Sequence, residues 1–194
     1  MKPPKARTRP LRERIVDAAL DAADDAGWGR VRLHALAARL GVGLAEIRAE
    51  FPDLDAVADA WLARADDAML AAGGGEGAPP ERIERALCAR FDALGGRRRV
   101  LRAVLAYKLA PAHLHLQAAL VVATSRRVQW LREAARLDSA GLQRQLEEIG
   151  LTALFASATA MWLFEREDGA ATRRYVRRRL AAADGVMQAL FRRR

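Results

Sequence analysis

The sequence LAARLGVGLAEI at residues 36–47 has the spacing of two short helices joined by a tight turn. Small Ala37 allows the two helices to approach, Gly41 suits the turn, and Val42 and Ile47 supply apolar contacts at the junction. This pattern predicts a helix-turn-helix, with an ordinary helical corner as the alternative. Its place after one predicted helix and before a longer one favours the helix-turn-helix.

Helical periodicity continues on both sides of this corner. Apolar residues recur at helical spacing over about 11–26, 33–40, 44–51 and 53–72. The composition agrees, because 43 alanines and 30 arginines stand against four isoleucines and five threonines, so good helix formers outnumber the residues that sheets prefer. We therefore predict an all-helical protein.

The run GGGEGAPP at residues 73–80 is the clearest boundary in the sequence. Glycine loses the most entropy on ordering and proline cannot continue a helix, so this run predicts a linker. The linker separates a helix-turn-helix domain with its connecting helix (11–72) from a second helical domain (81–194). Helical patterns in the second domain run over about 81–94, 97–110, 112–136, 139–165 and 171–192, which makes about nine helices in all.

The net charge of +9 is concentrated at the two ends of the chain. Residues 1–10 are basic and rich in proline, which predicts a disordered arm that follows phosphates. Residues 15–72 carry five arginines against eleven acidic side chains, whereas residues 73–194 carry 22 basic and 12 acidic ones. An acidic helix-turn-helix is unusual in a protein that reads nucleic acid, so both DNA and an anionic membrane stay open as partners.

Residues 13–62 resemble the DNA-binding domain of the TetR (tetracycline-repressor) family. The resemblance lies in IVDAAL at 15–20, Gly27-Trp28, Leu36-Ala37, Gly41-Val42 and Phe51-Pro52. It implies a TetR-like fold, in which a three-helix N-terminal domain joins through a fourth helix to a helical domain that binds a ligand and dimerises. RFDAL at 90–94 and residues 150–180 are also similar to a TetR-like branch related to the lipid-binding accessory proteins of ubiquinone biosynthesis.

The resemblance places the DNA contacts on the basic arm and on the corner. The candidate residues are Lys2, Lys5, Arg7, Arg9, Arg32, His34, Arg39, Gly43, Leu44 and Arg48. For the charged ones the alternative is a solvated surface side chain. The sequence departs from the family at several positions. Arg32 replaces the hydroxyl that caps the second helix, and Leu54 replaces a phosphate-binding lysine between two aspartates that repel phosphate. Most of the family's base and phosphate partners on the recognition helix are also replaced, by Gly43, Ala45, Glu46, Arg48 and Glu50.

The last two predicted helices have the pattern of the four-helix bundle that joins TetR subunits. The resemblance thus implies a homodimer with an interface at Ala153, Ala156, Ser157, Ala160, Val176, Leu180 and Met187. Packing within one chain is the alternative. Residues Arg173 to Arg194 hold eight arginines and one acid, so an anionic membrane surface is a further candidate partner of this segment.

Apolar residues interspersed with a few polar groups predict a pocket for a small hydrophobic ligand, and plain core packing is the alternative. The candidates are Leu105, Tyr107, Leu109, His113, Leu116, Gln117, Leu120, Trp130, Phe155 and Trp162. We expect no metal, because His113 and His115 are two residues apart and cannot share a helix face. We expect no cofactor and no enzymatic activity either, since neither a nucleophile elbow nor an HExxH pair occurs.

These observations predict a TetR-like transcriptional regulator, a repressor that binds double-stranded DNA as a homodimer and responds to a small hydrophobic ligand. The alternative is a lipid- or isoprenoid-binding accessory protein of the same fold that acts at a membrane surface without binding DNA. A single cysteine and the lack of an apolar leader segment favour the cytoplasm.

Overall fold

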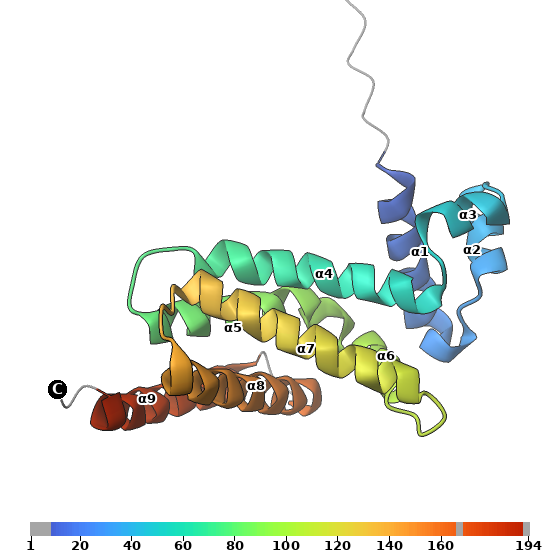
Figure 1. Ribbon diagram of the computed structural model, residues 1–194. Helices are drawn as coiled ribbons and strands as arrows, with labels where there is room; N and C mark the ends of the chain where they lie inside the picture. Colours follow the sequence, from blue (N-terminus) through green and yellow to red (C-terminus); the bar gives the residue numbers. More distant parts are fainter. Residues whose placement is uncertain (1–8, 166–168, 192–194) are drawn as a thin grey trace, which may run out of the picture.

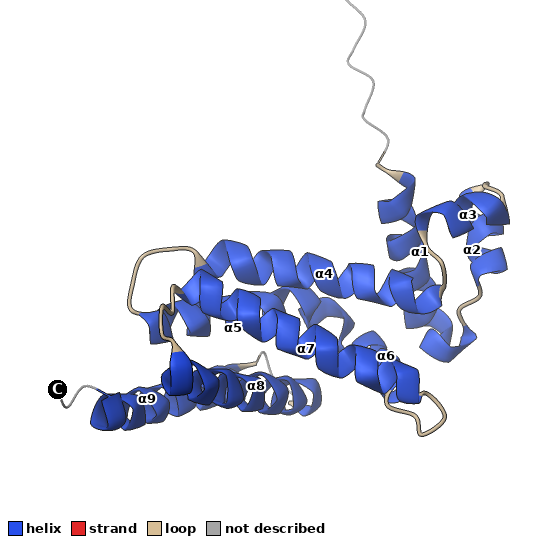
Figure 2. Cartoon of the chain, viewed as in Figure 1, coloured by secondary structure: helices blue, strands red, loops and turns tan. Residues whose placement is uncertain are grey.

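The computed structural model describes residues 9–165 and 169–191, and all regular structure in these ranges is helical (Figure 2). This confirms the predicted fold class. Short 3-10 helices lie at Trp28–Arg30 and Gly95–Arg97. The α-helices are α1 (Leu11–Ala26), α2 (Leu33–Leu40), α3 (Leu44–Glu50), α4 (Leu54–Gly73), α5 (Pro79–Leu94), α6 (Arg98–Lys108), α7 (Leu114–Ala135), α8 (Gly141–Phe164) and α9 (Ala170–Phe191).

Helices α1, α2 and α3 form a small unit at one end of the molecule, here called the head, and α4 runs from it along the remaining helices (Figure 1). Trp28, Ile47 and Phe51 are almost completely buried and hold the head together. Gly41 ends α2 with a φ of 67°, in the left-handed region that glycine adopts without strain. The turn at Gly41 therefore lets α3 fold back across α2.

Helix starts in the head are fixed by short-range hydrogen bonds. Asp53 Oδ1 accepts from the Ala56 N–H at 2.7 Å and caps α4, and Glu46 Oε2 accepts from the Gly43 N–H at 2.8 Å at the start of α3. Among the described residues, no side chain caps α2. Arg32, which occupies that position, instead donates to the Gly29 carbonyl at 2.8 Å.

Helices α5 to α9, here called the body, lie in two layers, with α8 and α9 beneath α4, α5 and α7 (Figure 1). The upper layer is tightest at Gly73, where an added Cβ would lie 2.8 Å from the Cβ of Ala134 and 3.3 Å from that of Ala86. Phe91 stacks on Trp162 with ring centroids 5.3 Å apart and joins α5 to α8. The apolar core is thus continuous from one layer to the other.

Residues 74–78 separate α4 from α5, a shorter break than the predicted linker at 73–80. Gly73 belongs to the last turn of α4, and Pro79 and Pro80 begin α5, where their missing N–H groups would have no partner in the helix. The division into domains at this break stays a prediction.

Among the described helices, none is both long enough and apolar enough to cross a membrane.

Candidate nucleic-acid interface and ligand pocket

Helix α3 presents one face to solvent at the far end of the head (Figure 1). Ile47 and Phe51 are completely buried against the core of the head, whereas Gly43, Leu44 and Arg48 are exposed. No other described part of the chain covers this face of α3. The corner formed by α2 and α3 therefore has the free helix surface that entry into a DNA groove requires.

The charged residues predicted on the corner differ in the contacts that they form within the chain. Arg48 and His34 are exposed and form no hydrogen bond or ion pair within the described ranges. Arg39 lies 3.6 Å from Asp21, and Arg32 donates to the backbone carbonyls of Gly29 and Val31. Arg48 and His34 thus keep all their donors for an outside partner such as a phosphate or a base edge.

The arm enters the described structure at Arg9, which donates to Asp17 at 2.8 Å. The other predicted arm contacts, Lys2, Lys5 and Arg7, lie outside the described residues. Sequence reasoning missed Arg12, whose guanidinium lies 4.2 Å from the centroid of the Phe51 ring and donates to the Glu50 carbonyl. These contacts hold a further cation at the C-terminal end of α3.

Three of the four aspartates of α1 are paired with arginines from elsewhere in the chain. Arg97, between α5 and α6, donates to Asp21 at 2.8 Å and also to Asp24. Arg64 of α4 donates to Asp17 at 2.6 Å. The acidic excess counted along residues 15–72 is therefore partly neutralised by the body in the folded chain.

The carboxylates at the start of α4 are also engaged. Asp53 caps the helix, and Asp55 and Asp59 lie 3.3 and 3.2 Å from the ammonium of Lys108, the last residue of α6. Asp55 is thus oriented towards the body. Lys108 partly neutralises Asp55, whereas repulsion of a phosphate near the start of α4 stays a prediction.

Two residues of the predicted ligand pocket belong to the core. Phe155 and Trp162 keep 5% and 2% of their surface accessible. Trp162 packs between Phe91 and the guanidinium of Arg98, and Phe155 lies under the guanidinium of Arg90. We therefore remove both from the pocket, because their neighbours in the chain already cover their faces.

Other predicted pocket residues close the corner between α6 and α7. His113 Nδ1 lies 2.8 Å from the Tyr107 carbonyl oxygen, and Gln117 donates to the Leu109 carbonyl at 3.3 Å. These polar groups stabilise the turn, which corrects their expected role of orienting a ligand. The remaining apolar candidates are partly or fully buried on α6 and α7: Leu105, Leu116 and Leu120.

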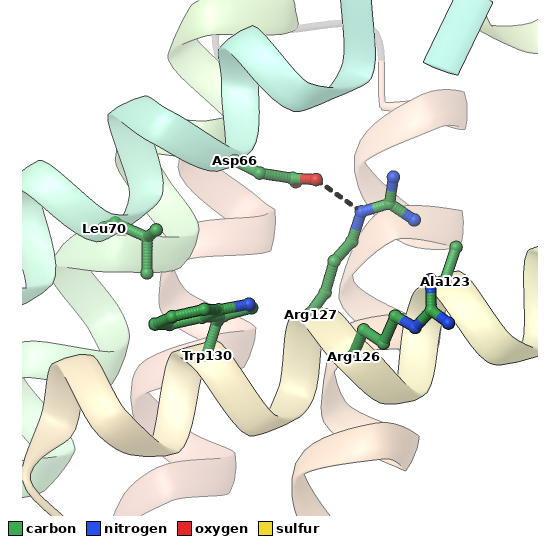
Figure 3. A pocket seen from close by; sticks show the side chains of 6 residues that line it. All are labelled: Asp66, Leu70, Ala123, Arg126, Arg127 and Trp130. Atoms are coloured by element: carbon green, nitrogen blue, oxygen red, sulfur yellow. Dashed lines mark hydrogen bonds and ion pairs between the residues drawn. The ribbon is translucent and has the colours of Figure 1, made fainter. Parts of the chain in front are cut away.

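An open pocket of about 190 Å³ lies between α4 and α7. Its lining residues are Asp66, Leu70, Ala123, Arg126, Arg127 and Trp130 (Figure 3). Trp130 was the one lining residue predicted. Arg126 and Arg127 lie four and three residues before Trp130, a spacing that puts them on neighbouring parts of one helix face. The sequence therefore held a signal that these two arginines lie beside Trp130. The sequence held no such signal for Asp66, which lies 61 residues from Arg127 along the chain.

The predicted interface residues divide between surface and core. Ala153, Ala156 and Ala160 are exposed on α8, and Met187 is half-buried on α9. Ser157 accepts a hydrogen bond from the Tyr175 hydroxyl at 2.9 Å. Val176 and Leu180 are buried at 0% and 7% inside this chain, so we correct their predicted contact with a second copy.

Helix α8 carries a longer exposed apolar stripe than the sequence predicted. The stripe follows alternating spacings of four and three residues, as in a coiled-coil seam. Sequence reasoning missed its first half, Leu142, Leu146 and Ile149. From residue 149 onward the helix is apolar on nearly every side, so the sequence there does not reveal which side faces outward. Its members are Leu142, Leu146, Ile149, Ala153, Ala156 and Ala160, here called the α8 stripe.

Two arginines of the basic C-terminal segment are paired within the chain. Arg173 lies 2.5 Å from Asp92, and Arg177 donates to both carboxylate oxygens of Glu84. The bonds to Glu84 raise the pKa of Arg177 above its ordinary value. The cationic surface of α9 that remains unpaired by acids consists of Arg174, Arg178 and Arg179, and residues 192–194 lie outside the described part of the chain.

Within the described ranges, no three His, Cys, Asp or Glu side chains gather in a way that could hold a metal ion. Cys88 is half-buried on α5, and burial raises the pKa of its thiol.

Comparison with solved structures shows close likeness to one protein in both sequence and fold. A TetR transcriptional regulator from Nitrosomonas europaea is 38% identical and has a TM-score of 0.79, with 91% of this chain and 99% of that chain covered. No family model and no curated protein matches the sequence.

Two further structures share the fold. A TetR transcriptional regulator from Rhodococcus sp. RHA1 is 19% identical, with a TM-score of 0.62 and coverage of 88% of this chain and 94% of that one. A TetR-family regulator from Streptomyces coelicolor is 17% identical, with a TM-score of 0.64 and coverage of 92% and 82%.

Proposed function

Because this chain belongs to the TetR family of transcriptional regulators, we propose that it binds double-stranded DNA through the corner formed by α2 and α3. The observation that carries the proposal is the outward face of α3, where Arg48 is exposed and unpaired. Gly43 at the start of α3 has no side chain and leaves room for the backbone to approach a base edge, and Leu44 offers an exposed apolar side chain beside it. Arg39 and Arg32 then lie on the same corner as contacts to the phosphate backbone.

The protein acts as a homodimer in this proposal. The α8 stripe and the exposed Val186 and Leu190 of α9 supply an apolar surface that one chain leaves uncovered. A two-fold pair of chains joined there carries two heads, as half-sites about 34 Å apart on one face of a duplex require.

The regulator is a repressor that a small ligand releases from DNA. The ligand binds in the body and favours one separation of the two heads, so that binding to the two half-sites changes. Of the predicted hydrophobic pocket only Trp130 lines the pocket between α4 and α7, since the other predicted residues are dispersed between the core and the α6–α7 corner.

The test begins with genomic fragments retained by the native protein, from which an operator duplex is identified. Titration of that duplex should show that Arg48→Ala weakens binding by about tenfold or more, as expected for loss of a base or phosphate contact. Arg174→Ala is the charge-matched control, because Arg174 is exposed on α9, a helix that lies away from the head (Figure 1). Retention of random fragments only, or equal losses for the two variants, would contradict the proposal.

The lipid-binding alternative has one observation in its favour, namely that α9 exposes Val186, Leu190 and Phe191 on a helix that also bears Arg178 and Arg179. Co-sedimentation with phosphatidylglycerol vesicles at several salt concentrations tests it. The alternative would be favoured over the regulator if the protein bound the vesicles, if the double variant Arg178→Ala/Arg179→Ala abolished that binding, and if no operator were recovered.

A further inference from the structure

The pocket between α4 and α7 combines an apolar wall with a cationic end. Leu70 and Trp130 form the wall, and Trp130 keeps 59% of its surface accessible. Arg126 and Arg127 rise from α7 beside them, and the Arg127 side chain reaches Asp66 on α4 (Figure 3). A site of this kind suits a ligand that has both an apolar body and a negative charge.

The single carboxylate at the pocket is shared between two guanidinium groups. Asp66 Oδ1 accepts from Arg90 Nε at 2.9 Å, and Asp66 Oδ2 accepts from Arg127 Nε at 2.7 Å. Arg90 is 4% exposed, and its Nη1 is buried without a hydrogen-bond partner. Arg126 is exposed and forms no ion pair within the described ranges. Three cations therefore stand against one anion.

The geometry of these bonds leaves donors unused. Arg127 binds Asp66 through Nε, and none of its terminal N–H groups has a partner among the described residues. A guanidinium presents these N–H groups in a planar fork that matches the two oxygens of a carboxylate. Each oxygen of Asp66 already accepts from one guanidinium, so Asp66 orients Arg127 more than it opposes an incoming anion.

We propose that this pocket binds a small carboxylic acid, with the carboxylate on Arg126 and Arg127 and an aromatic or aliphatic body against Trp130 and Leu70. The volume of about 190 Å³ lies below the roughly 300–1,000 Å³ of sites for drug-sized ligands, so the acid has the size of benzoate or hexanoate. The inference rests on the proposed function in one respect, that the body binds a small ligand. It replaces a purely hydrophobic ligand by an anionic one.

Fluorescence of Trp130 offers a direct readout without DNA. The other tryptophans, Trp28, Trp61 and Trp162, are 1%, 5% and 2% exposed, so a probe that enters the pocket should alter the emission of Trp130 first. We expect saturable binding of benzoate and hexanoate. Benzamide lacks the charge and acetate lacks the apolar body, so each should bind at least about tenfold more weakly. Calorimetry of the Trp130→Phe variant should still detect benzoate while the fluorescence change disappears.

Substitution separates the cationic end from general charge effects. Arg126→Gln and Arg127→Gln should each weaken benzoate binding by about tenfold, the loss expected for a charged hydrogen bond. Arg102→Gln is the matched control, because Arg102 is exposed on α6 and outside the pocket lining. Arg126 has no partner among the described residues, so its variant should fold even if removal of Arg127 disturbs Asp66.

Benzamide binding as tightly as benzoate, benzoate binding that Arg126→Gln leaves unchanged, or no binding of either acid would overturn the inference. These outcomes are distinct from failure of the proposed function. A protein that selects an operator yet binds neither acid remains a regulator without this site. A protein that binds benzoate yet selects no operator keeps the site and loses the proposed role on DNA.

Discussion

Lys108 is a deeply buried cation, with 4% of its side chain exposed. Its ammonium lies 3.3 Å from Asp55 and 3.2 Å from Asp59, so two carboxylates of α4 neutralise one cation from the end of α6. Asp55 is 21% and Asp59 59% exposed, and water therefore solvates the acids far better than the lysine. The two sides of this ion pair are not energetically equivalent.

Removal of both acids should cost more than removal of the lysine. The double variant Asp55→Asn/Asp59→Asn leaves a buried ammonium without a counter-charge and should lower the free energy of unfolding by about 3–5 kcal/mol. Lys108→Met leaves two partly solvated carboxylates and should cost about 1–2 kcal/mol. Urea unfolding at neutral pH measures both. The reverse order would show that Lys108 is better solvated than the structure indicates.

Gly73 occupies a position where a side chain does not fit. An alanine Cβ there would lie 2.8 Å from Ala134 Cβ, so Gly73→Ala should separate α4 from α7 and destabilise the protein by about 1–3 kcal/mol. Gly185→Ala is the control, because Gly185 lies within α9 with no heavy atom within 4 Å of an added Cβ. That variant should gain about 0.5–1 kcal/mol from helix propensity. Thermal unfolding of the two proteins should shift in opposite directions.

The start of α9 depends on a carboxylate from the end of α8. Glu165 accepts hydrogen bonds from the N–H groups of Ala171 and Thr172 at 2.6 and 3.1 Å and from the Thr172 hydroxyl. Partial burial alone would raise the pKa of Glu165, but these bonds and the charge of Arg98 outweigh it and lower the pKa below the ordinary value of 4.5. Ionised Glu165 therefore stabilises the folded state.

This contribution has a definite pH dependence. It is complete above pH 4.5 and is lost as the pH falls through the lower pKa of the folded state, because protonation then favours the unfolded chain. Glu165→Gln should cost about 1 kcal/mol at pH 7 and much less at pH 3, as measured by urea unfolding at both values. Glu76→Gln, in the exposed loop between α4 and α5, should show no such difference.

The helices and their ends could be predicted from the sequence. Which face of each helix is exposed to solvent could be predicted only in part. Gly41, Pro52 and the periodicity of Leu36 and Ile47 specify α2 and α3 because turn and breaker residues act locally. The places of Phe155 and Trp162 depend on residues far along the chain, such as Phe91 and Arg98. An apolar residue has the same appearance in the sequence whether it packs against a protein side chain or a ligand.

The count of charges along the sequence was a poor guide to the charge of the folded surface. The excess of acids over residues 15–72 argued against a nucleic-acid interface. In the folded chain Arg97, Lys108 and Arg127 approach these acids from the body, while Arg48 stays unpaired on the exposed face of α3. Only the three-dimensional arrangement shows which charges face a partner and which face one another.

The α8 stripe predicts the oligomeric state of the complete protein. Ala156→Glu places a charge in the middle of the stripe, so it should convert the dimer to a monomer and weaken operator binding at least about tenfold, because each half-site then binds one head alone. Ala181→Glu, an exposed position on α9 outside the stripe, is the control. Analytical ultracentrifugation measures the mass. A dimer that persists in the Ala156→Glu variant would exclude the stripe as the interface.

The pairing of Arg97 with Asp21 and Asp24, and of Lys108 with Asp55 and Asp59, constrains any attempt to build chimeric regulators from this protein. A head transplanted together with α4 onto a foreign body would carry these carboxylates without their cations and would gain a cluster of unpaired acidic side chains just behind the recognition surface. An exchange that keeps affinity for its operator would therefore have to transfer Arg97 and Lys108 together with the helices they neutralise.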